Sequence, residues 1–302
     1  MRLNVLWFTL SLVLIFLLYE LSGAKVQGIN LAYFSLSSLL FLASTFFWAL
    51  AWIYVMKAPT RKALIIHLRS LAGVFAPMGL GADMLRSFWA SKEKGMKPDR
   101  ALACSLIVKF FKFILMFLLL LFSVIALSSR SYDFPQYVFI FISMLFSALI
   151  GLLIIILLRS RKTIAFIHHF IRKLFLWRFH EELNLNFDRL RLRDIAFIII
   201  VLMLSVVFEI GAAWAAFLSV SQELPLLHII IFSSVASSLA LITVSPQGLG
   251  FVEAGSYFLL SMGYFSLSRV VIGNVLIVWN IVRLWIPSIV GLFASLVKRS
   301  DR

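Results

Sequence analysis

Two carboxylates follow nearly the same short phrase in the two halves of this 302-residue sequence. Residues 77–83 read Pro-Met-Gly-Leu-Gly-Ala-Asp, and residues 246–253 read Pro-Gln-Gly-Leu-Gly-Phe-Val-Glu. Proline removes a backbone donor and glycine allows positive φ, so each phrase should interrupt a helix. An acid in the first turn of the following helix is stabilised by the helix dipole, which is a purely structural role for Asp83 and Glu253. The functional alternative is that free N–H groups there hold an anion such as phosphate, while the carboxylates meet a cationic headgroup or take up protons.

Four more charged residues lie inside apolar stretches. Lys109 and Lys112 are three residues apart and therefore share a helix face. Arg283 is about 14 residues into its apolar stretch, where a charge costs at least ~2.5–3.5 kcal/mol. From the proline of each phrase, Lys112 is 35 residues on and Arg283 is 37 residues on, so a cation recurs at a similar point. Each of these residues also has a structural alternative to a role in substrate binding. Lys109 could extend its ammonium to the interface by snorkelling, and Glu209 and Arg283 could neutralise each other as an ion pair.

Arg86 follows Asp83 by three residues, which favours a local ion pair or a contact with lipid phosphate. The candidate substrate-binding residues are therefore Pro77, Gly79, Gly81, Asp83, Arg86, Lys109, Lys112, Glu209, Gly248, Gly250, Glu253 and Arg283.

Motifs for catalysis and for metal binding are weak in this chain. The sequence has no Gly-x-Ser-x-Gly elbow, no phosphate-loop lysine motif and no zinc motif. Its one cysteine, Cys104, excludes an intramolecular disulfide, and the neighbours His168 and His169 point to different faces of a helix. We expect no metal and no cofactor, and an enzymatic role is the weaker hypothesis.

The composition indicates an integral membrane protein, because 62% of the residues are hydrophobic and only 14% are charged. The net charge of +15 could suggest nucleic-acid binding, but the basic residues cluster between apolar runs, as in cytoplasmic loops. We therefore expect no nucleic-acid partner.

The apolar segments predict about six transmembrane helices, at residues 3–21, 31–56, 101–128, 136–158, 195–218 and 270–297. A cleavable signal peptide is the alternative for the first. Two further apolar stretches are too short to cross and are broken by the glycine phrases, which predicts re-entrant helical hairpins near 63–90 and 228–262. Residues 159–194 have helical apolar spacing among basic residues, typical of an amphipathic linker on the cytoplasmic face.

The distribution of Lys and Arg predicts the orientation. With both termini inside, 22 of the 28 basic residues lie on the cytoplasmic side, three lie outside and three lie within spans. The order of two spans, a broken hairpin and a span then occurs twice, with the second copy inverted. The first membrane half is predicted at residues 1–158 and the core of the second half at residues 195–302. The span at 136–158 lies in the first half of the chain but belongs to the second repeat. Chance is the alternative explanation, since Gly-Leu-Gly is common in a leucine-rich chain.

The runs PMGLGADMLRSFW and SPQGLGFVEAGSYF resemble the membrane domain of lysylphosphatidylglycerol synthases and the wider flippase-like family. That family shows a Pro-x-x-Gly-Gly-Asp-x-x-Arg type motif early and a Gly-Gly-x-Gly-x-x-Glu type motif late. The first corresponds here to Pro77, Gly81, Asp83 and Arg86, and the second to Gly248, Gly250 and Glu253. Lys109 or Lys112 stands where the family often has an arginine. This chain departs from the family pattern in that leucine splits each glycine pair.

The full synthases continue into a soluble aminoacyl-transferase domain, whereas this sequence stops at Arg302. The resemblance therefore implies lipid translocation rather than lipid synthesis. We expect an all-α polytopic protein of a bacterial or archaeal cytoplasmic membrane that moves a lipid with a charged headgroup, or a lipid-linked intermediate. The alternatives are a membrane-embedded accessory or lipid-modifying protein that works with a separate lipid or sugar transferase, and a carrier of small solutes.

Overall fold

The computed structural model describes the chain in six ranges, together with a few positions before residue 29: 29–75, 81–92, 98–128, 192–242, 250–262 and 265–297. Within these ranges the regular structure is helical throughout and contains no strand. The expected all-α fold is thus confirmed for the part of the chain that the structure describes.

Four helical stretches in these ranges are long and apolar enough to cross a membrane, namely Leu31–Met56, Arg100–Ala126, Arg193–Ser219 and Arg269–Leu296. They belong to α2 (Leu31–Met56), α5 (Pro98–Ser128), α8 (Leu192–Ser219) and a composite C-terminal helix. That helix consists of α11 (Arg269–Asn280), a π-helical turn η5 (Ile281–Trp285) and α12 (Ile286–Val297).

Four of the six expected spans are therefore found as helices with these properties. The expected spans at 3–21 and 136–158 lie outside the described residues, apart from isolated positions of the first. The same holds for the linker at 159–194, except for its last three residues, which begin α8. The total of six spans and the division of the chain into halves stay predictions.

The ends of α2 follow ordinary capping chemistry. The Oδ1 atom of Asn30 accepts a hydrogen bond from the Ala32 N–H at 3.0 Å, which satisfies one of the free donors at the start of the helix. Lys57 ends the helix in the left-handed conformation, with φ of 52°. The capped helix is 26 residues long, enough to cross a bilayer.

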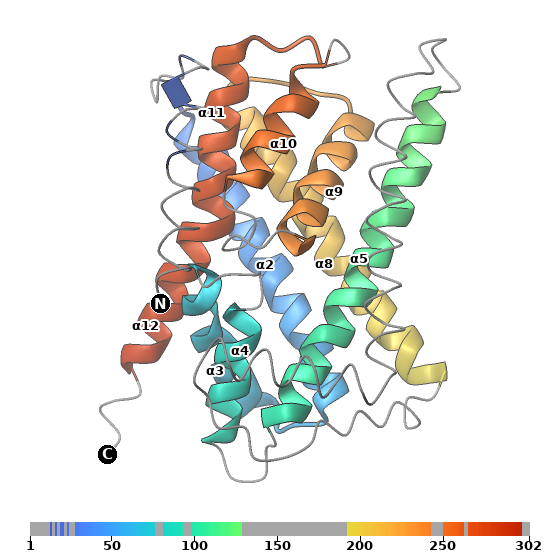
Figure 1. The fold of residues 1–302 in the computed structure, drawn as a ribbon, viewed down its shortest axis with the longest axis vertical. Coiled ribbons are helices and arrows are strands. Elements are labelled where there is room, and N and C mark those ends of the chain that lie inside the picture. The colour runs from blue at the N-terminus through green and yellow to red at the C-terminus, as the bar shows by residue number, and fades with distance from the viewer. Residues whose placement is uncertain are drawn as a thin grey trace.

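Helix α2 packs along α8 through small polar side chains (Figure 1). The Ser37 hydroxyl donates to the carbonyl of Ala212 at 2.7 Å, and the hydroxyls of Ser44 and Ser205 lie 3.1 Å apart. Small side chains let two helix backbones approach closely, which is how helices associate in lipid. This pair forms the centre of the bundle.

Two pairs of short helices lie at opposite ends of the bundle (Figure 1). The first pair is α3 (Thr60–Ser70), continued by the 3₁₀ turn η1 (Leu71–Phe75), and α4 (Gly81–Ser91). The second pair is α9 (Leu226–Ile242) and α10 (Phe251–Leu260). The two helices of each pair contact each other, at the positions expected for the hairpins near 63–90 and 228–262. The turns between them lie outside the described residues, and the inverted symmetry of the two halves stays a proposal.

The composite C-terminal helix contacts both pairs, because α11 packs on α10 while α12 packs on α3 and η1. At Gly291 the α12 backbone comes so close to the backbone of Ala72 that a Cβ atom would clash. The Arg69 Nε atom also donates to the carbonyl of Ala294 at 3.2 Å. The helix thus ties the two ends of the bundle together.

The π-helical turn in this helix has an identifiable cause. The Ile286 N–H bonds to the carbonyl of Ile281, five residues back. The next residue, Pro287, has no N–H, and its ring would clash with the carbonyl of Arg283 in a regular α-helix. The wider turn therefore surrounds Arg283, and π turns of this kind occur frequently at functional sites.

Candidate functional site

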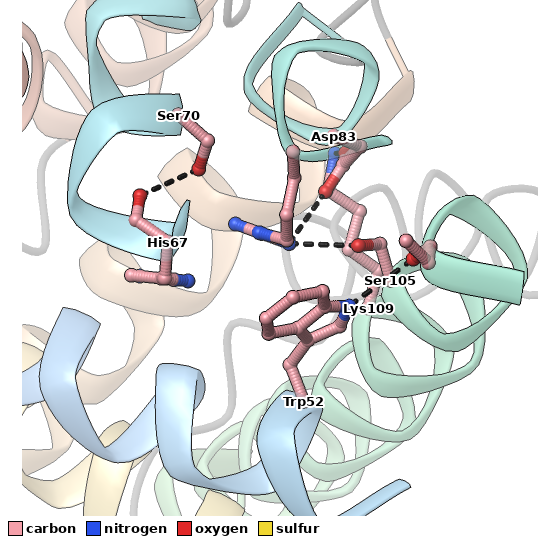
Figure 2. Close-up of polar contacts among 8 residues, drawn as sticks. Trp52, His67, Ser70, Asp83, Ser105 and Lys109 are labelled. Atoms are coloured by element: carbon pink, nitrogen blue, oxygen red, sulfur yellow. Dashed lines mark hydrogen bonds and ion pairs between the residues drawn. The ribbon is translucent and has the colours of Figure 1, made fainter. Parts of the chain in front are cut away.

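Asp83 lies in the first turn of α4 and bonds two cations. Its Oδ1 atom is 3.1 Å from the Arg86 Nη1 atom, and its Oδ2 atom contacts the Lys109 ammonium from α5. The same Arg86 nitrogen donates to the Ser105 hydroxyl at 2.8 Å. Figure 2 shows Asp83 facing Ser105 and Lys109, with the ring of Trp52 beneath them. The expected local pair of Asp83 and Arg86 is present, and Lys109 is buried here instead of extending to the interface.

Two tryptophans of α2 pack against the cations of this cluster. The Arg86 guanidinium lies 5.2 Å from the ring centroid of Trp52 and 5.8 Å from that of Trp48. The Lys112 ammonium lies 5.1 Å from the Trp48 centroid. A cation at such distances from an aromatic ring is stabilised by about 2 kcal/mol when water is excluded. Trp48 therefore contacts both the Asp83 cluster and the next ion pair.

Lys112 bonds Glu209, which joins α5 to α8. The Lys112 Nζ atom is 2.6 Å from the Glu209 Oε2 atom, and the Ser237 hydroxyl of α9 donates to Glu209 Oε1. A pair of Glu209 with Arg283 was one of the two structural alternatives for these residues. The structure does not form that ion pair, because Arg283 bonds a different carboxylate.

That carboxylate is Glu253, in the first turn of α10. The Arg283 Nη2 atom lies 3.2 Å from Glu253 Oε1, and it donates to Asn280 Oδ1 at 3.4 Å. The other carboxylate oxygen accepts the N–H of Gly250, whose φ of 84° is readily adopted only by glycine. Glu253 thus caps its helix and holds Arg283 at the same time.

The ion pairs border one small cavity of about 90 Å³. Its polar lining is Ser44, Thr45, Trp48, Arg86, Lys109, Lys112, Glu209, Ser237, Ser238 and Arg283. These residues come from five α-helices and the π turn, including one helix of each hairpin. Asp83 and Glu253 do not belong to the lining, but each bonds a cation that does. The charged residues that line the cavity are therefore four cations and one carboxylate, beside seven apolar residues.

Among the described residues, the cluster holds four cations and three carboxylates, so its formal charge is +1. Buried ions are tolerated only when they are paired and hydrogen-bonded, and removal of one partner typically costs about 3–5 kcal/mol. Each of the seven charged groups has a partner of opposite sign. Such a concentration of charge inside an apolar bundle is the usual mark of a functional site in a membrane protein.

Sequence reasoning named all seven of these charged residues. It also named Gly81, which begins α4, and Gly250, which caps α10. Pro77, Gly79 and Gly248 lie outside the described residues.

Sequence reasoning missed several uncharged residues of the site, which are the partners Trp48, Trp52, Ser105, Ser237 and Asn280 and the lining residue Ser238. A helical signal was available for some of them. Ser105 precedes Lys109 by four residues and Asn280 precedes Arg283 by three, so each shares a helix face with its cation.

A larger cavity, of about 680 Å³, lies among α5, α8 and α9. Its lining is almost wholly apolar: Leu115, Leu118, Leu119, Met203, Val206, Val207, Ile210, Gly211, Trp214, Leu224, Leu226 and Ile230. Leu115 follows Lys112 by one helical turn, and Ile210 directly follows Glu209. The two cavities are therefore built on neighbouring turns of the same helices, one polar and one suited to hydrocarbon.

The described residues contain no group of three or more His, Cys, Asp or Glu side chains arranged to hold a metal ion. A family model described as the lysylphosphatidylglycerol synthase TM region matches residues 4–291. Neither the curated proteins nor the solved structures contain a significant match. The apolar helices and this match together identify a multi-pass membrane protein.

Proposed function

Because the chain belongs to the lysylphosphatidylglycerol synthase TM region family, a membrane family tied to lipid handling, we propose that it is a lipid translocator. Its cargo is a lipid with a charged headgroup, or a lipid-linked intermediate. The headgroup passes through the polar cavity while the acyl chains stay in hydrocarbon. A separate lipid or sugar transferase is a natural partner for such a protein, since it would make or use the lipid.

One observation carries this proposal: seven charged side chains, of which all but the 13% exposed Lys112 are buried, line one cavity between the two helix pairs or bond a residue that does. A charged headgroup cannot cross hydrocarbon cheaply, and exchange of these ion pairs for contacts with the headgroup would lower that cost. The cavity is lined by α4 of the first hairpin and by α9 of the second. Movement of one hairpin relative to the other would therefore change the access of a headgroup to the cavity.

In the proposed orientation both termini lie in the cytoplasm of a bacterium or archaeon. The α3–α4 hairpin then enters from the cytoplasmic side and the α9–α10 hairpin from the outside, as in an inverted repeat. The basic residues Lys57, Arg61 and Lys62 around the start of α3, and those between α4 and α5, support this orientation.

Reconstitution of the purified full-length protein in liposomes tests the proposal. Phospholipids carry a fluorescent label on the headgroup, and a reductant that cannot cross the membrane bleaches the label of the outer leaflet. We expect inner-leaflet label to become accessible much faster than in empty liposomes. Arg283→Gln should slow this by about 10-fold or more, because it removes the partner of buried Glu253.

Arg69→Gln is a matched control, since Arg69 is also a buried arginine but does not line the cavity. It should translocate at the rate of the unmodified protein if it reaches a similar melting temperature. Redistribution no faster than in empty liposomes would refute the proposal. A changed headgroup, detected by mass spectrometry of the lipids, would instead favour the lipid-modifying protein.

A further inference from the structure

Three residues that line the polar cavity carry buried donor atoms with no hydrogen-bond acceptor among the described residues. These atoms are the Trp48 Nε1, the Ser238 Oγ and the Arg86 Nε. Their residues belong to α2, α9 and α4 and line the cavity from different helices. Neither the Trp48 indole nor the Arg86 guanidinium can accept a hydrogen bond. The residues around the cavity therefore hold buried donors that lack an acceptor among the described residues.

A buried donor without a partner costs about 1–3 kcal/mol, so a ligand rich in acceptors would gain from each of them. The charges favour the same kind of ligand. The lining has four cations, Arg86, Lys109, Lys112 and Arg283, but one carboxylate, Glu209. Both observations select an anion with several oxygen atoms.

The size of the cavity limits that anion. A space of about 10–15 Å³ is enough for one water molecule, so about 90 Å³ accommodates a compact group of several heavy atoms. A tetrahedral phosphate has this size, offers only acceptors when fully ionised and carries the required charge. Hydrogen bonds to such a charged acceptor are roughly twice as strong as neutral ones.

We propose that the cavity binds the phosphate group of a lipid, with Trp48 Nε1 and Ser238 Oγ donating to its oxygens beside the Arg86 and Lys112 cations. The assignment of the phosphate to a lipid rests on the proposed function. It is supported by the apolar cavity of about 680 Å³, which is built on the next turns of α5 and α8 and would take an acyl chain. Trp48 and Ser238 are then substrate-binding residues.

Binding is measured on the full-length protein in a maltoside detergent, which contains no phosphate. The probes are phosphatidylglycerol, diacylglycerol with the same chains, and sn-glycerol 3-phosphate, and the readout is the dissociation constant from native mass spectrometry or from a thermal-shift titration. We expect phosphatidylglycerol to bind at least about 10-fold more tightly than either of the other two. Trp48→Phe and Ser238→Ala should each weaken its binding by about 10-fold, the loss of one hydrogen bond to a charged group.

The chain offers a matched control for each substitution. The Trp279 Nε1 and Ser233 Oγ atoms are also buried without a partner among the described residues, but neither residue lines the cavity. Trp279→Phe and Ser233→Ala should therefore leave the dissociation constant unchanged. If the Trp48 variant fails to fold, Ser238→Ala still provides the test, since it removes one hydroxyl group only.

Each of three binding results would overturn the inference. Equal binding of diacylglycerol would exclude phosphate recognition, and equal binding of sn-glycerol 3-phosphate would make the ligand a free phosphate compound. Weakening by the control substitutions as large as that by Trp48→Phe and Ser238→Ala would exclude this cavity. Selective binding of phosphatidylglycerol without its translocation would refute the proposed function alone. Translocation of a phosphate-free glycolipid at the same rate would refute the phosphate site alone.

Discussion

The ion pair of Lys112 and Glu209 allows a quantitative test of how the charged cluster stabilises the bundle. Lys112→Met keeps the unbranched stem of the side chain but removes the ammonium group. In the unmodified protein that group lies 2.6 Å from Glu209 Oε2, and the lysine and glutamate side chains are only 13% and 5% exposed. After the change, Glu209 keeps the Ser237 hydroxyl as a donor but loses its cation.

The expected loss of stability follows from this burial. Removal of one partner from a buried pair costs about 3–5 kcal/mol, because the remaining charge is left uncompensated. With an unfolding entropy of about 2.1 cal/mol/K per residue, one kcal/mol shifts the melting temperature of this 302-residue chain by roughly 1.5–2 °C, so we expect Lys112→Met to lower it by about 5–8 °C. The double variant Lys112→Met with Glu209→Gln has no uncompensated charge, and it should recover more than about half of that loss.

The assay is thermal unfolding in a detergent of fixed composition, followed by tryptophan fluorescence, for the two single variants and the double variant. Lys92→Met is the control, because Lys92 is exposed and, among the described residues, its ammonium lies over the rings of Phe88 and Trp89 and forms no ion pair. It should shift the melting temperature by no more than about 2 °C. A double variant that is as unstable as the sum of the single variants would show that the two charges are not coupled, and would refute the reasoning.

Three further predictions concern the hairpins. Gly250→Ala should destabilise the protein by about 1–2 kcal/mol, measured as a lower melting temperature, because it places a side chain at φ of 84°. Gly291→Ala should lower the melting temperature at least as much, since the added Cβ would meet the backbone of Ala72; an unchanged value would mean that the two backbones are not in close contact. In a variant whose single cysteine is replaced by serine, Lys92→Cys should react with an impermeant maleimide only from the cytoplasmic side and Glu223→Cys only from the opposite side. Labelling of both from one side would exclude the opposed hairpins.

Local contacts of the site followed from the sequence because helical spacing determines them. Asp83 and Arg86 are three residues apart on α4, and their ion pair is the one that this spacing predicts. The position of Glu253 in the first turn of a helix followed in the same way from the glycine phrase that precedes it. In both cases the bonded residues, Asp83 with Arg86 and Gly250 with Glu253, are three apart in the sequence and so lie within one helical turn.

Partners from different helices could not be predicted with the same success. Arg283 bonds Glu253 rather than Glu209, because the rotation of each helix about its own axis decides which carboxylate it meets. A hydrophobic stretch fixes the length of a span but not this rotation, since lipid offers no polar face to orient it. Trp48 was missed for the same reason: its role depends on α2 turning that face towards α4 and α5.

The π turn around Arg283 sets the angular phase between the two halves of the last helix. An α-helix advances by about 100° per residue, so deletion of a single residue in η5 would rotate the face of α12 by that angle relative to α11. Gly291 would then no longer face Ala72, while α11 would still pack on α10. A π turn holds one residue more than an α-helical turn. This extra residue therefore sets the rotation at which α11 packs on α10 while α12 packs on α3 and η1.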